Sequence, residues 1–265
     1  MKKFLNMTAI ALLVGVLASC ASSGSVSTRE AQAEVAVYDR AFWDRSPKGS
    51  QLIFIGVGAF RSNHDEAIKL AVENAARQVA IFHRVEGSFM LQAVIGSGTL
   101  DYRADTETSL RFDDAYVKYV DSLEYDVETD VRERDNSIFV RTRYTAPVAI
   151  AVAFTPSADE ARPAWVKDPP SELGAYTAAV GQAGRRSQHR DTVNASHENA
   201  ILSIIRNRSS SSKSETKSTE TDTNSTGETK SRLEASGVVE RFYILETWTD
   251  PADKAVWTLG IVPKD

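Results

Sequence analysis

Apolar and polar positions follow the same order twice along this chain. Residues 53–58 and 176–181 are short apolar segments bounded by turn-forming residues, and each predicts a buried strand. Each segment is followed by small residues at helical spacing, over 67–79 in the first half and 192–200 in the second. The pattern therefore predicts a strand and then a helix in both halves.

After each expected helix the hydrophobic period changes to two. In the first half, the alternation over 123–127 and 138–144 predicts two strands around a turn at Asp135 and Asn136. In the second half, 239–248 and 255–262 predict an equivalent pair around a turn at 250–253. The predicted fold class is α+β, with two tandem strand-helix-strand-strand units, each a helix packed on a small, mainly antiparallel sheet.

Identical residues in the same order favour a duplication over chance similarity, which is the alternative. The matches require two extra residues in the second copy. They pair 43–47 with 165–169, Gly58 with Gly181, and 73–75 with 198–200. The domains predicted from this comparison are a first repeat over 35–155 and a second over 156–265.

Three local patterns predict packing and capping roles. Ser62 with Asp65 resembles a capping box at the start of the first helix. Asn74 and Asn199 lie on the inward helix stripe, so we expect both to hydrogen-bond buried backbone. The motif from Gly56 to Gly58 lacks the third glycine of a dinucleotide fingerprint and is more typical of close packing at a strand end.

A polar insert separates the second helix from its hairpin. Residues 209–231 contain no hydrophobic side chain and are mostly Ser, Thr, Lys and Glu. Such a segment buries too little surface to offset its ordering entropy, which predicts disorder. The alternative is a polar hairpin that orders on oligomerisation, because threonines alternate with charged residues over 219–223.

The N-terminus has the order of a secretory signal. Lys2 and Lys3 precede an apolar run over 8–17 that is too short to span a bilayer comfortably. The run ends in Leu17-Ala18-Ser19-Cys20, which resembles the lipobox of bacterial lipoproteins. The resemblance implies a signal peptide over 1–19, peptidase recognition through Leu17, Ala18 and Ser19, and lipid attachment at Cys20. An ordinary signal peptide containing a cysteine is the alternative; residues 20–34 are predicted to be a tether.

Composition excludes several classes of protein. The chain has 265 residues, 42% of them hydrophobic, a net charge of −5 and one cysteine. These values exclude a disulfide framework and a cysteine-rich zinc site, and they give no reason to expect nucleic acid as a partner.

No residue pattern predicts catalytic, metal-binding or cofactor-binding residues. P-loop, nucleophile-elbow and His-Glu-x-x-His motifs do not occur in the sequence. Solvated or capping roles are expected for His189 and His197, and the carboxylates over 126–135 are expected to face water. Trp43 and Trp165 are expected to pack at the end of the sheet and helix layer rather than to stack on a ligand.

Together the lipobox, the Trp-x-x-x-Pro segments, the strands ending in Val-Gly and the Glu-Asn-Ala helices resemble a known family. This is the twenty-kilodalton bacterial outer-membrane lipoprotein family, which is similar to the N-terminal domain of flagellar assembly protein T. The resemblance implies a non-catalytic structural or scaffolding lipoprotein, self-assembling or associated with a flagellar or envelope complex. The alternative is a tethered regulatory binding module, such as an activator of a peptidoglycan synthase.

The same resemblance implies a location and partners. Ala21, rather than Asp, follows Cys20, and the lipoprotein sorting rule then implies the outer membrane, facing the periplasm. Inner-membrane anchoring and surface exposure stay open. The expected partners are membrane lipid through the Cys20 anchor, a further copy of the chain and an envelope or flagellar protein.

Overall fold

The structure is a computed structural model that describes residues 41–60, 63–95, 103–157, 162–211 and 229–264. Residues 43–265 form one compact unit, and the helices and strands named here belong to its described part. The predicted signal peptide, lipobox and tether lie outside the described residues.

From residue 51 on, the described part of the first half contains one long helix, one 3-10 helix and five strands. In chain order these are β1 (Gln51–Ala59), α2 (His64–His83), β2 (Val85–Ile95), β3 (Arg103–Phe112), η1 (Tyr116–Ser122), β4 (Val131–Arg134) and β5 (Ser137–Thr145).

The second half repeats the strand, helix and hairpin order and adds two short elements at its start. The elements are α3 (Ala164–Lys167), β6 (Glu172–Leu173), β7 (Tyr176–Ala183), α4 (His189–Ser211), β8 (Thr229–Val239), β9 (Tyr243–Thr249) and β10 (Val256–Pro263).

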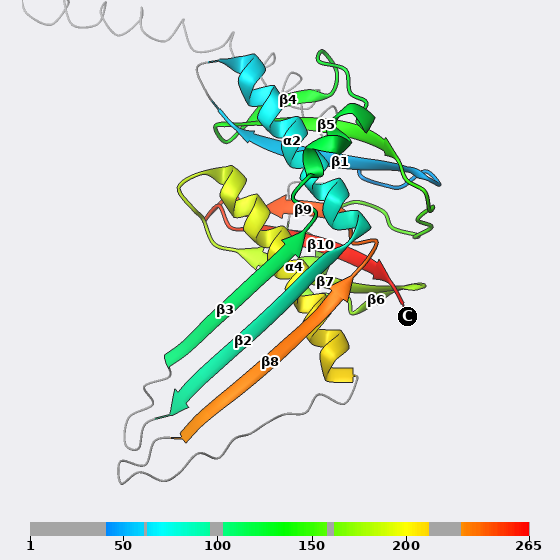
Figure 1. The fold of residues 1–265 in the computed structure, drawn as a ribbon. Helices are drawn as coiled ribbons and strands as arrows, with labels where there is room; N and C mark the ends of the chain where they lie inside the picture. Colours follow the sequence, from blue (N-terminus) through cyan, green and yellow to red (C-terminus); the bar gives the residue numbers. More distant parts are fainter. Residues whose placement is uncertain (1–40, 61–62, 96–102, 158–161, 212–228, 265) are drawn as a thin grey trace, which may run out of the picture. The chain divides into compact units, whose positions relative to one another are not determined.

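The strands form three antiparallel sheets, so the predicted α+β class is confirmed. The sheet orders are β1-β5-β4, β6-β7-β10-β9 and β3-β2-β8. The helix α2 packs on β1 and β5, and α4 packs on β7 and β10. The third sheet combines β2 and β3 with β8, which follows α4, and α4 also contacts this sheet (Figure 1). The two halves therefore share a sheet.

Glycines allow each helix to lie directly on its strand. A Cβ added at Gly56 would overlap the backbone of Ala71 and Ala75, and one added at Gly181 would overlap that of Ser196 and Ala200. Because these contacts are equally spaced in sequence, Gly181 is the counterpart of Gly56. The predicted match of Gly181 with Gly58, and the two extra residues that it required, are wrong. The duplication itself stays a prediction.

The motif from Gly56 to Gly58 is a packing motif, as expected. A Cβ at Gly58 would overlap the carbonyl of Ala67, one turn before the contact of Gly56. Small residues on α2 complete the close fit, since Ala67, Ala71 and Ala75 have no exposed surface. Glycine is required at these positions because helix backbone occupies the space of a side chain.

Both predicted turns are present, but one predicted strand is not. Asp135 and Asn136 have φ of 49° and 55°, a left-handed pair that suits a tight hairpin turn between β4 and β5. The first strand of that hairpin is β4, not the predicted 123–127, where Glu124 contributes an isolated bridge to Arg143. The hairpin of β9 and β10 around 250–253 is confirmed, but its first strand begins at Tyr243 and not at 239, because Val239 pairs with β2 as the end of β8.

Two boundaries differ from the sequence patterns. The N-cap of α2 is Asn63, whose Oδ1 accepts hydrogen bonds from the backbone N–H groups of Asp65 and Glu66. Ser62, the predicted cap, lies outside the described residues. The polar segment predicted over 209–231 is shorter at both ends, because α4 continues to Ser211 and β8 begins at Thr229. Residues 212–228 lie outside the described part.

The glycine contact gives a direct stability test. We expect Gly56→Ala to lower the free energy of unfolding by about 2 kcal/mol or more, because the added methyl group displaces α2 from β1. Gly184→Ala is the matched control, since a Cβ there meets nothing within 4 Å. Urea unfolding of the two variants measures the difference. Equal urea midpoints for the two variants would show that stability does not depend on the close approach of α2 to β1.

Candidate functional site

The most extensive polar arrangement follows the backbone edge of β1 that faces away from β5. Tyr243 on β9 lies at this edge, and its hydroxyl accepts a hydrogen bond from the Ile53 N–H at 3.1 Å and donates one to the Arg45 carbonyl at 2.6 Å. The side chain is fully buried, and burial raises the pKa of Tyr243 to about 12. A residue of the second half thus satisfies backbone groups of the first.

The helix α2 supplies the next two contacts along the same edge. Gln78 Nε2 donates to the Ile55 carbonyl at 2.8 Å, and Asn74 Oδ1 accepts from the Val57 N–H at 3.0 Å. The prediction that Asn74 bonds buried backbone is confirmed. Gln78 was not predicted from the sequence. It lies one helical turn after Asn74, and this i,i+4 spacing places both residues on the same face of the helix.

The same side chains connect α2 with α4. Asn74 Nδ2 donates to Asn194 Oδ1 at 3.0 Å, and Arg77 pairs with Glu198 at 2.8 Å. We call the set of side chains around this contact the polar junction. It consists of Arg45, Asn74, Arg77, Gln78, Asn194, His197, Glu198 and Tyr243.

Arg45 is a buried cation within the polar junction. Its exposure is 3%, and among the described residues its guanidinium makes one hydrogen bond, from Nη1 to Gln78 Oε1 at 3.3 Å, and no ion pair. Burial lowers the pKa of Arg45 to about 10, and the nearby Arg141 acts in the same direction. Sequence reasoning did not single out this residue.

His197 is the second buried titratable group of the polar junction. Its exposure is 3%, and Nε2 makes no hydrogen bond within the described part of the chain. Burial, and then the charges of Arg45 and Arg77, hold the pKa of this imidazole well below its usual value. The prediction of a solvated or capping role is therefore wrong, because the packing of α4 places this face of the helix in the interior.

Asn199 does not repeat the environment of Asn74. Its Nδ2 donates to the Gln182 carbonyl at 2.6 Å, so it bonds the backbone as expected. The side chain is nevertheless exposed, which makes the expectation of burial wrong. In the second half, Asn199 thus still bonds the neighbouring strand, but its side chain is exposed to solvent.

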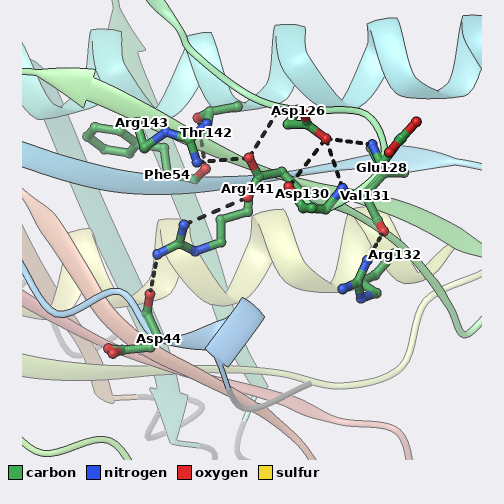
Figure 2. A network of polar contacts seen from close by, with 11 residues as sticks. Asp44, Phe54, Asp126, Glu128, Asp130, Val131, Arg132, Arg141, Thr142 and Arg143 are labelled. Carbon is green, nitrogen blue, oxygen red and sulfur yellow. Dashed lines mark hydrogen bonds and ion pairs between the residues drawn. The ribbon is translucent and has the colours of Figure 1, made fainter. Parts of the chain in front are cut away.

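Asp126 and Asp130, in the acidic stretch over 126–135, form a second network, which Figure 2 shows. Asp130 is 5% exposed and lies 2.8 Å from Arg143 and 3.8 Å from Arg141, both on β5. The expectation that these carboxylates face water is wrong for Asp130, since the loop before β4 folds it onto the arginines. Arg141 also contacts the carbonyl of Asp44, at 3.5 Å.

Asp126 shapes the loop that carries Asp130. Its Oδ1 accepts hydrogen bonds from the backbone N–H groups of Thr129 at 3.0 Å and Glu128 at 2.9 Å, and these bonds lower the pKa of the carboxyl. Its own N–H donates to Asp130 Oδ2 at 3.0 Å. These carboxylates bond backbone N–H groups of the loop and guanidinium groups of β5, so they stabilise the fold of the loop.

The remaining histidines have separate partners. His64 is exposed beside Glu133; His83 hydrogen-bonds the Tyr144 hydroxyl at 2.8 Å; and burial, followed by Lys118, lowers the pKa of His83. Burial also lowers the pKa of His189. Within the described ranges, no group of three or more His, Cys, Asp or Glu is placed to hold a metal ion.

Both tryptophans of the repeated segments pack against the fold. Trp165 is buried, and its Nε1 donates to Glu246 Oε2 at 2.8 Å. Trp43 lies with its ring edge-on to Phe139, with 4.8 Å between centroids. These contacts agree with the expected packing role.

The predicted lipid-attachment residues fall in the undescribed N-terminus. Leu17, Ala18, Ser19 and Cys20 lie outside the described residues. Among the helices that the structure does describe, none is both long and apolar enough to cross a membrane.

Comparison with protein-family models, with curated proteins and with solved structures found no match for this chain. The resemblance to outer-membrane lipoproteins therefore stays a prediction from the residues quoted above.

The two asparagines provide a matched pair of variants. We expect Asn74→Ala to lower the free energy of unfolding by about 1–3 kcal/mol, because it leaves the buried Val57 N–H without its acceptor. Asn199→Ala should cost less than about 0.5 kcal/mol, since water replaces the lost bond at an exposed site. Chemical denaturation measures both. A larger loss for Asn199→Ala would contradict the assignment of Asn74 as the bridging residue.

Proposed function

We propose that this chain is a non-catalytic, lipid-anchored protein of the bacterial envelope with a structural or scaffolding role. In this proposal, copies of the chain associate through the sheet of β2, β3 and β8. The observation that carries the proposal is an open edge of this sheet: β3 is ten residues long and, like β8 on the other side, pairs with β2 alone among the described strands.

An unpaired strand edge is a ready template for pairing with another chain. Glu107, Thr108 and Ser109 in the middle of β3 are exposed, so a second strand has access to this edge. The edge of β1, by contrast, is covered by the side chains of Tyr243, Gln78 and Asn74. Of these two edges, β3 is the better candidate for assembly.

The use of polar groups favours a structural role over an enzymatic one. The polar junction satisfies backbone groups and connects two helices, and Asp130 holds two arginines of β5. Catalytic acids and bases instead converge on a substrate cleft. The lipobox resemblance at Cys20 supplies the proposed attachment to the outer membrane.

Assembly is tested by the mass of the full chain in detergent, measured by sedimentation over a concentration series. We expect a defined oligomer, and we expect Thr108→Lys with Ser109→Lys to reduce it to monomer, because lysines on an edge oppose strand pairing. Ala115→Lys with Ser122→Lys adds the same charge at exposed positions outside the strands and is the control. A monomeric wild-type chain would favour the tethered binding module instead.

The anchor is tested separately by membrane fractionation. We expect the wild-type protein in the outer-membrane fraction. The Cys20→Ser variant should carry no acyl chains, since the lipobox thiol is the proposed attachment point. Mass spectrometry of the N-terminal peptide reports the modification. An unmodified Cys20 in the membrane-bound wild type would contradict the proposed anchor.

A further inference from the structure

His197 lies on α4, near the polar contact of this helix with α2. In sequence it falls between Asn194 and Glu198, whose side chains bond those of Asn74 and Arg77 on α2. Asn74 is the link to the strand, because one amide accepts from Val57 and donates to Asn194. A disturbance at His197 therefore acts on the bonds that join α4 to α2.

The surroundings of His197 oppose a positive charge on its ring. The ring is buried, and Nε2 makes no hydrogen bond within the described part of the molecule. The charged groups that act on it there are Arg45, from the segment before β1, and Arg77, from α2. Arg77 is already paired with Glu198, and Arg45 has no ion pair among the described residues. An imidazolium here would meet two like charges.

We propose that His197 makes the polar junction acid-sensitive, so that protonation of its ring weakens the contact between α4 and α2. This inference does not depend on the proposed scaffolding function. It rests on the burial of His197 and Arg45, on the partly buried pair of Arg77 with Glu198, and on the hydrogen bond between Asn74 and Asn194.

The direction of the pH effect follows from proton linkage. The folded-state pKa of His197 lies below its usual value of 6.5, so the closed junction binds fewer protons than the open one. Its stability is fully present above about pH 6.5 and falls as the pH decreases toward the folded-state pKa. For one proton, the equilibrium constant for opening rises by up to about tenfold per pH unit in this range.

Amide hydrogen exchange of the full chain in detergent, followed by mass spectrometry between pH 8 and pH 5, tests the inference. Protection is expressed relative to the rate of an unstructured peptide at the same pH. We expect peptides covering α2 and α4 to lose protection below about pH 6.5, while those covering β2 keep theirs. His197→Gln should abolish this loss, because glutamine does not titrate. His64→Gln, at an exposed position, should leave it unchanged.

Other results would overturn the inference. An unchanged loss of protection in His197→Gln would show that another group titrates, and simultaneous loss in α2, α4 and β2 would show global unfolding. Should His197→Gln not fold, Arg77→Gln provides the second test. Because Arg77→Gln also removes the pair with Glu198, its acid-induced loss is measured relative to its own protection at pH 8. This loss should be smaller than in the wild-type chain, because one charge that opposes the imidazolium is gone. An equal loss in a folded Arg77→Gln would also contradict the proposal.

Discussion

The unpaired backbone edge of β1 is the constraint that organises this molecule. β1 has β5 on one side only, so its other edge presents N–H and C=O groups to the interior. A buried backbone group without a hydrogen bond costs about 1–3 kcal/mol, which makes these contacts obligatory. Tyr243, Gln78 and Asn74 provide them in place of a neighbouring strand. Since Tyr243 comes from the far end of the chain, the first half depends on the second for a complete core.

Close packing of α2 on β1 allows its side chains to reach the backbone edge of the strand. Gly56 and Gly58 allow α2 to approach β1 until helix backbone fills the space of two side chains. Only at that distance do the short amides of Asn74 and Gln78 reach the strand edge. The second half repeats the glycine contact at Gly181, but Asn199 is exposed there. The two halves thus share a packing device and differ in the burial of the polar residue beside it.

The shared sheet gives the molecule a second connection between its halves. β8 pairs with β2 along eleven residues, in register from Val85 with Val239 to Ile95 with Thr229. This pairing joins segments that lie far apart in sequence, and α4 packs on the sheet that they form. The polar junction and this sheet are therefore two connections between the halves, and α4 takes part in both. The proposed acid response concerns the first of them, and the proposed assembly uses the β3 edge of the second.

The sequence alone determined the local elements, because their signals are local. Hydrophobic period, small residues at helical spacing and turn formers predicted β1, α2, β7, α4 and the β9–β10 hairpin near their actual positions. The inward position of Asn74 also followed from helical spacing. Only the tertiary structure decided that Tyr243 and Arg45 meet at one edge, that His197 and Asp130 are buried, and that β8 joins β2. These outcomes depend on contacts between residues distant in sequence, and helical or strand period carries no information about such partners.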